Sequence, residues 1–180
     1  MLAVLELDCS PVTALVAKES ARVTAAALPR VSADPLDLDA RADLLHGSWL
    51  AGTALGSTTM SLHHKLCHIL GGAYDLPHAP VHTAVLPHVL AINLPAAPAA
   101  GFALKSAWDT PDPAGHVFRL ARGLGAEMSL KALGLPEQGI DVVVDQTLAA
   151  PYANPRPVTE TLLRPLLRNA FAGVSPTEDS

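Results

Sequence analysis

Sixteen prolines and twelve glycines divide this 180-residue chain into short segments rich in alanine and leucine. Most of these segments have the length and composition of α-helices, because alanine and leucine have high helix propensity. The only β-branched run is IDVVV at residues 140–144, and these residues also fit one face of a helix. The sequence therefore predicts an all-α fold rather than a sheet fold.

Prolines and capping residues set the expected helix boundaries. Ser10 before Pro11 begins the first helix, which should end at about Leu28, before Pro29. The third expected helix should end at the glycine pair 71–72. The later helices are expected at about 37–56, 58–70, 78–93, 113–124, 136–150 and 158–173, with a short helix or turn at 129–134.

A chain of this length can form one domain with its own core. We expect a single helical domain over residues 1–175 and a polar tail at 176–180. Residues 94–112 carry the weakest signal for regular structure. They are predicted to be a flexible linker or a lid.

Composition excludes several classes of protein. The net charge is −5 and only 4% of the residues are aromatic, so nucleic acid is not an expected partner. No apolar run approaches the ~20 residues that a membrane span needs, and the first ten residues lack the basic region of a signal peptide. The two cysteines, Cys9 and Cys67, form no CxxC pair, which favours a reduced, cytoplasmic setting.

Six of the eight histidines lie between residues 60 and 88. His64 and His68 are four residues apart, so both imidazoles lie on one face of a helix. His78 and His82 have the same spacing at the start of the next expected helix. Because the intervening glycines and loop let that helix fold back, we expect these four imidazoles to line one pocket.

A lone histidine on a half-apolar helix is more often a polar core or boundary residue. That interpretation is preferred for His46, His63, His88 and His116. A zinc-protease motif is absent, because position 65 is lysine where HExxH requires glutamate. Cys67 is expected to be a buried thiol rather than a nucleophile.

The segment LHHKLCHILGGAYDLPHAPVHTAVLPHVLAIN, residues 62–93, resembles maleylacetate reductases, a branch of the iron-containing alcohol dehydrogenase family. Residues 26–57 and 120–158 are similar as well, so the resemblance covers about residues 10–173. It implies the C-terminal helical domain of that family, which has a dehydroquinate synthase-like fold. The family's N-terminal nucleotide-binding domain has no counterpart here, and no G-x-G-x-x-G turn is present.

The resemblance also implies roles for three histidines. His64 and His78 match two of the four metal ligands of metal-dependent relatives, and His68 matches a histidine implicated in proton transfer. The other two ligands, an Asp and a His upstream, have no counterpart, and Asp8 aligns with a loop. Since catalytic sites usually offer three protein ligands, no metal is expected in the isolated chain. Iron or zinc and NAD(P)H are expected only if a partner supplies the missing ligands and nucleotide domain.

Three hypotheses about function remain. In the first, the chain is a stand-alone enzyme in which His64, His68 and His78 perform cofactor-independent acid–base chemistry on a small carbonyl-containing substrate. The reaction would be an isomerisation, elimination, hydration or cyclisation. In the second, it is the substrate-domain subunit of a split NADH-dependent maleylacetate reductase. In the third, it is a non-catalytic binding module.

If Met1 is the natural start, the first hypothesis is favoured. Five further residues are candidates for shaping the pocket and holding a carboxylate or enolate of the substrate; they are Trp49, Lys65, His82, Tyr152 and Arg156. Loss of a nucleotide domain would bare an apolar face. We therefore expect a homodimer, or binding to a separate nucleotide-binding subunit.

Overall fold

The computed structural model describes residues 9–150 and 152–176, and within these residues it contains eight α-helices, one 3-10 helix and no strand. The all-α prediction is therefore confirmed for this part of the chain. The helices are α1 (Pro11–Ala33), α2 (Leu38–Leu55), α3 (Leu62–Tyr74), α4 (His78–Asn93), η2 (Leu94–Ala96), α5 (Pro98–Trp108), α6 (Pro113–Gly123), α7 (Gly139–Leu148) and α8 (Glu160–Ala172).

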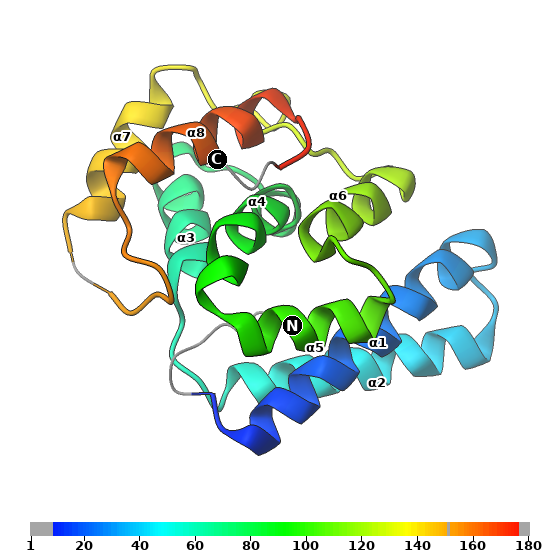
Figure 1. Cartoon of the computed structure of the whole chain (residues 1–180). Helices are drawn as coiled ribbons and strands as arrows, with labels where there is room; N and C mark the ends of the chain where they lie inside the picture. The colour runs from blue at the N-terminus through cyan, green and yellow to red at the C-terminus, as the bar shows by residue number, and fades with distance from the viewer. Residues whose placement is uncertain (1–8, 151, 177–180) are drawn as a thin grey trace.

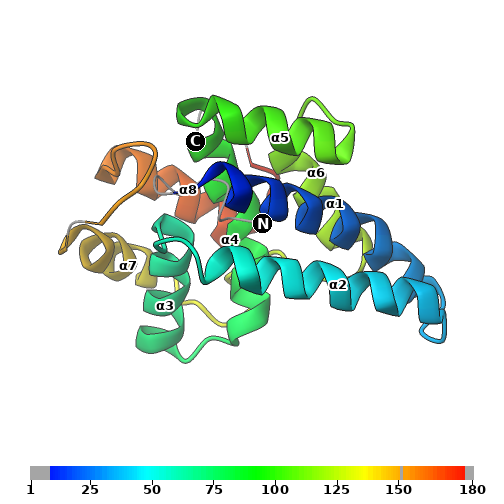
Figure 2. The same cartoon turned by 90° about the horizontal axis from the view of Figure 1, so that it is seen from below.

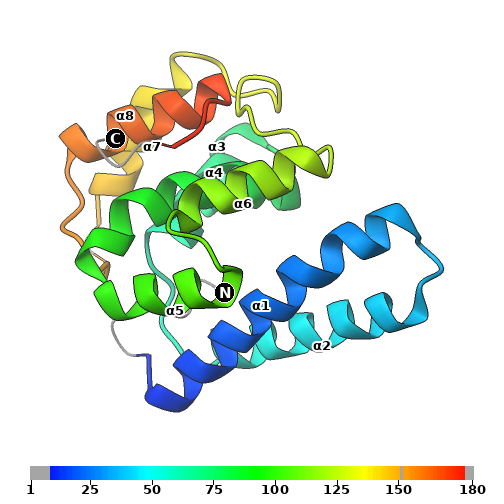
Figure 3. The same ribbon diagram turned by 45° about the vertical axis from the view of Figure 1, so that its right-hand side comes forward.

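Helix α4 is the centre of the arrangement. It contacts α3, α6 and α8, while α7 packs against both α3 and α8. Helices α1 and α2 form an antiparallel hairpin that extends away from this group (Figures 1 and 3). Seen from below, α5 lies beside α1 on the side away from α2 (Figure 2). Of the described helices, none combines the length and the apolar character that crossing a membrane requires.

Two apolar clusters hold these helices together. The main core joins α3, α4, α7 and α8 through buried leucines and valines such as Leu66, Val89 and Leu163. A second cluster joins α1, α4 and α5 mostly through alanines, with Leu90 and Leu104 as its large members. Because each fully buried leucine or valine contributes roughly 1.5–3 kcal/mol, the main core carries most of the stabilisation of the α3–α4 hairpin.

The predicted helix starts are confirmed where a capping residue sets them. Ser10 Oγ accepts a hydrogen bond from the backbone N–H of Thr13 (3.1 Å). Asp37 and Asp112 cap α2 and α6 in the same way. Each cap uses a partner three residues away, so it is encoded locally and is readable from sequence.

Two predicted helix ends are wrong. Helix α1 continues through Pro29 to Ala33, and in this last turn Arg30 forms ion pairs with Asp37 and Asp43. Helix α3 continues through both glycines to Tyr74 and ends at Asp75, which adopts φ = 52°. In both cases the helical hydrogen bonds continue past the proline or glycine, to Asp34 N–Arg30 O and Asp75 N–Gly71 O.

Residues 94–112, predicted to be a flexible linker or a lid, contain more regular structure than the sequence indicates. Residues 94–96 form η2 and residues 98–108 form α5. Ala100 and Leu104 of α5 are buried in the same cluster as Ala17 and Ala21 of α1. The small side chains that weakened the sequence signal are what allows this close packing. The proposed tail beyond residue 176 and the first eight residues lie outside the described residues.

The end of α8 depends on a glycine. Gly173 has φ = 67°, and a Cβ there would lie 2.9 Å from Ser129 Cβ and 3.2 Å from Ser129 Cα. The same region is tied by two hydrogen bonds, from Leu130 N to Ala170 O and from Ser129 Oγ to Phe171 O. Gly125 also has positive φ, but a Cβ at that position would meet no atom within 4 Å.

These two glycines give a matched prediction. Gly125→Ala should lower the free energy of unfolding by about 1–2 kcal/mol through backbone strain alone. Gly173→Ala should cost about 1–3 kcal/mol more, because the new methyl group meets the Ser129 backbone. Urea unfolding of both variants measures the difference. Equal losses would contradict the packing argument.

Candidate functional site

The α3–α4 hairpin brings five imidazoles into a continuous series of ring contacts. The ring centroids of His64 and His68 are 6.5 Å apart, and those of His64 and His82 are 5.5 Å apart. His78 lies 4.2 Å from His82. The four histidines selected from the sequence therefore lie together, two from each helix.

His63 is the fifth member, and the sequence interpretation assigned it only a core role. It is 4% exposed, and its Nε2–H donates to the carbonyl oxygen of His82 (3.0 Å). Its ring also lies 4.9 Å from that of His82. The signal that places it in the core is its spacing, because His63 shares a helix face with Leu66, Cys67 and Leu70.

Burial keeps the inner part of this cluster uncharged. Desolvation lowers the pKa of His63 to about 3 and that of His82 to about 4. The pKa of His64 is lowered by desolvation and by the nearby His68. Cys67 is buried as expected, and burial raises the pKa of its thiol to about 12, so it is not a nucleophile at neutral pH.

Three of these imidazoles form an arrangement suited to a metal ion. His63, His64 and His82 each offer a ring nitrogen, and these atoms all lie within 4.8 Å of one another. Buried ring nitrogens of the same residues, including His63 Nδ1 and His64 Nδ1, have no hydrogen-bond partner among the described residues. The hydrogen bond from His63 to a backbone carbonyl is a typical support for a metal-ligating imidazole. The trio thus fits a divalent transition metal, with His82 in place of His78.

Lys65 and Tyr152 come together beside the histidines. Lys65 follows His64 on α3, and its Nζ lies 5.5 Å from the centroid of the Tyr152 ring. Tyr152 packs against the main core, and burial raises the pKa of its phenol to about 12. Arg156 is half-buried in the same loop. Lys65 and Tyr152 are therefore in contact, and Arg156 belongs to the same loop as Tyr152.

Trp49 is not brought to this region by any described contact. It lies on α2, is 66% exposed and stacks on His46 with ring centroids 6.2 Å apart. Its proposed role in shaping the pocket gains no support from its surroundings. His88 and His116 are core or boundary residues as predicted, His88 against Phe118 and His116 against Trp108.

A pair of asparagines was missed in the sequence. Asn93 at the end of α4 and Asn154 in the loop before α8 exchange two side-chain hydrogen bonds, each 2.9 Å long. They are 61 residues apart, so no local spacing links them. The only signal is an amide at the end of an otherwise apolar helix.

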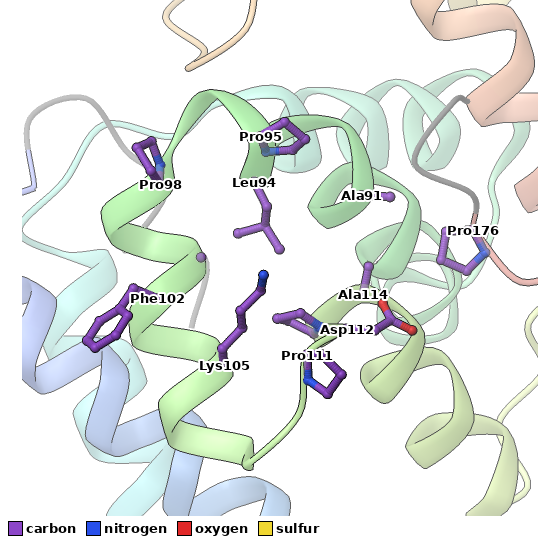
Figure 4. Close-up of a pocket in the computed structure, with 12 residues that line it drawn as sticks. Ala91, Leu94, Pro95, Pro98, Phe102, Lys105, Pro111, Asp112, Ala114 and Pro176 are labelled. Atoms are coloured by element: carbon purple, nitrogen blue, oxygen red, sulfur yellow. The ribbon is translucent and has the colours of Figure 1, made fainter.

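A recess of about 420 Å³ lies between η2, α5 and the start of α6 (Figure 4). Its walls are mostly proline and apolar side chains, and Lys105 extends into it (Figure 4). The carboxylate of Asp112 is already bonded to Gly115 N and Arg119. None of the residues predicted for the site lines this recess.

Residues 3–171 match the model of the Fe-containing alcohol dehydrogenase family, C-terminal domain. The chain belongs to this family. The domain resemblance inferred from the histidine motif is thereby confirmed.

The relatives include several maleylacetate reductases. The domain is 50% identical over 169 residues to the maleylacetate reductase of Sphingobium indicum and 45% identical over 170 residues to that of Burkholderia cepacia. Each match covers 94% of this chain and 48% of the relative. The chain thus spans about half the length of the curated relatives it matches.

Solved structures show the same fold. A putative alcohol dehydrogenase from Ralstonia eutropha superposes with a TM-score of 0.94 at 45% identity, covering 97% of this chain and 50% of the other. The maleylacetate reductase of Rhizobium sp. gives a TM-score of 0.92 at 41% identity, covering 97% and 49%. The helical array of the C-terminal domain is therefore retained.

His88 gives a prediction for pH dependence. Both of its ring nitrogens are buried without a partner among the described residues, and desolvation lowers its pKa from 6.5 to about 4. At pH values between 4 and 6.5, His88 is mostly protonated in the unfolded chain and mostly neutral in the folded domain. The free energy of unfolding should therefore fall as pH drops from 6.5 to 4, by as much as about 3 kcal/mol for this residue.

The variant His88→Gln separates this effect from that of other histidines. His63 and His82 also protonate on unfolding in this window, so the variant keeps part of the pH dependence. When the pH is lowered from about 7.5 to about 4.5, the free energy of unfolding of wild type should fall by about 2–3 kcal/mol more than that of the variant. A difference that does not change with pH would contradict it.

Proposed function

We propose that this chain is the substrate-binding and proton-donating half of an NAD(P)H-dependent reductase that acts on maleylacetate or a similar keto diacid. The observation that carries the proposal is the joint position of His64, His68, His78 and His82 in a domain with 50% identity to a maleylacetate reductase. The nucleotide would be held by the half of the relatives that this chain does not span. That half would be part of a longer protein or a separate subunit.

The residues divide into two groups by chemistry. His68 is the exposed end of the cluster and is our candidate for the proton donor, with His64 beside it and His78 connected to His64 through His82. Lys65 and Arg156 supply two cations for the carboxylates of the substrate, and the ring of Tyr152, whose hydroxyl is buried, supports the Lys65 ammonium. His82, between His64 and His78, orients the other imidazoles.

NAD(P)H supplies a hydride when it is bound, but no glycine-rich phosphate-binding turn occurs in this sequence. We therefore assign no step at the nicotinamide to this chain. For a metal, the trio His63, His64 and His82 would be the holder, and a bound divalent ion would polarise a carbonyl oxygen. The expectation of no metal in the isolated chain stays a prediction, as does the homodimer.

A second proposal is the stand-alone acid–base enzyme. It is favoured by one observation: the imidazole cluster is contributed entirely by α3 and α4 of this chain. Neutral imidazoles within contact distance can accept and return protons without a nucleotide. The reaction would be an isomerisation, elimination, hydration or cyclisation.

Reconstitution distinguishes the two proposals. The purified chain is mixed or co-expressed with the N-terminal half of the Sphingobium relative and assayed with maleylacetate and NADH. We expect NADH oxidation only when both halves are present. Consumption of maleylacetate by the chain alone, without NADH, would favour the second proposal. No consumption under any condition would leave only a binding role.

Removal of His68 tests the proton-transfer role. His68→Ala should reduce turnover by ~10²–10⁴-fold and leave folding intact, because this side chain is exposed. His64→Ala and His78→Ala should also reduce turnover. His116→Ala, at the Trp108 contact, is the control and should keep full activity. Full activity of all three cluster variants would refute the proposed site.

Metal binding by the trio has a direct test. If the trio holds a metal, zinc added to the metal-free chain should bind, and His82→Ala should weaken binding by roughly 10–100-fold or more because a ligand is lost. His78→Ala should weaken it less. Calorimetric titration with zinc measures both. If His78→Ala weakens zinc binding more than His82→Ala does, the ligands include His64 and His78, the pair that the sequence resemblance implies. No zinc binding by wild type would support the expectation of no metal.

A further inference from the structure

The asparagine pair places two amides where the structure tolerates few polar groups. Asn93 is completely buried, and its Nδ2 and Oδ1 both bond to the side chain of Asn154. A buried amide without partners costs roughly 1–3 kcal/mol in protein experiments. The two side chains therefore satisfy each other and join the last residue of α4 to the loop at 152–159.

Asn154 makes a third hydrogen bond that fixes its orientation. Its Nδ2 also donates to the carbonyl oxygen of Arg156 (2.6 Å). Because a carbonyl oxygen can only accept, the amide nitrogen must face it, and Oδ1 must face Asn93. Only an amide side chain offers two donors and one acceptor in this arrangement.

The same bond fixes the backbone of Arg156. Pro155 and Pro157 flank the arginine and restrict their own φ angles to about −65°. The carbonyl of Arg156 is held by Asn154, and Asn154 is held by α4. The arginine backbone is thus connected to α4 through a chain of hydrogen bonds.

The loop reaches α3 at its other end. Tyr152, two residues before Asn154, packs against the main core with the Lys65 ammonium 5.5 Å from its ring centroid. Lys65 is adjacent to His64 in α3. The loop at 152–156 therefore connects the end of α4 to the histidine-bearing part of α3.

We propose that Asn93 and Asn154 are a positioning pair for substrate binding. They hold the loop at 152–156, which carries Arg156 and the Tyr152 ring that Lys65 contacts, so that the two cations can bind a small dicarboxylate. The pair does not touch the substrate and acts through Arg156 and Tyr152. This inference rests on the proposed function for the identity of the ligand, but not for the position of the loop.

The first experiment needs no ligand. Hydrogen exchange is measured by NMR at the side-chain amide of Asn154, whose nitrogen donates to Asn93 and to Arg156, in wild type, Asn93→Ala and Gly125→Ala. Asn93→Ala should accelerate exchange in this loop by about tenfold or more, as a local opening. Gly125→Ala lowers global stability without touching the pair and should leave the loop unchanged. Equal exchange in wild type and Asn93→Ala would overturn the positioning role.

The second experiment measures affinity for maleylacetate by calorimetry, well below the unfolding midpoint of every variant. Arg156→Ala and Asn93→Ala should each raise the dissociation constant by about ten- to hundredfold, and Gly125→Ala should not. If Arg156→Ala weakens binding and Asn93→Ala does not, the positioning inference is wrong and the proposed function stands. If wild type does not bind maleylacetate, the proposed function loses its support, and the exchange experiment still decides the position of the loop.

Discussion

Burial of the leucine face of α3 against α4, α7 and α8 is the constraint on which the site depends. Leu62, Leu66 and Leu70 are completely buried and occupy successive turns of one helix face. Their burial fixes the rotation of α3 about its own axis. Once that rotation is fixed, His63 must enter the core beside Leu66, and His64 must lie at its edge. The histidine cluster is therefore positioned by apolar packing rather than by interactions among the imidazoles.

Partial burial gives this cluster its chemical character. Imidazoles close together and removed from water are held neutral, because each charge would face both desolvation and another imidazolium. Neutral rings keep a lone pair available for a proton or a metal ion. His68 and His78 remain exposed at the outer end, where a substrate can reach them. One helix hairpin thus presents both a protected and an accessible set of nitrogens.

Local sequence rules predict the helices well and their ends less well. Helix α4 begins at His78 and ends at Asn93 as expected, and the starts at Pro11 and Pro113 follow from caps next to a proline. Pro29 and Gly71 fail as stop signals: the turn after Pro29 is tied to Asp37 and Asp43 through Arg30, and the turn after Gly71 ends in Tyr74, which packs against the main core. Residues 98–108 form a helix because α1 offers a matching surface of alanines. These outcomes depend on partners distant in the chain, which local propensity cannot report.

The sequence by itself determined the helical class, the family resemblance and the grouping of His64, His68, His78 and His82. The grouping follows from residues close together in the chain, where helical spacing and one short loop fix which faces meet. Tertiary structure decided that His63 and His82 join His64 in a trio that could hold a metal ion, and that Trp49 is exposed and stacks on His46. It also decided that Asn93 meets Asn154 across 61 residues. Such contacts arise when separate helices pack on a common core, and the side chains that meet there are chosen by packing rather than by spacing along the chain.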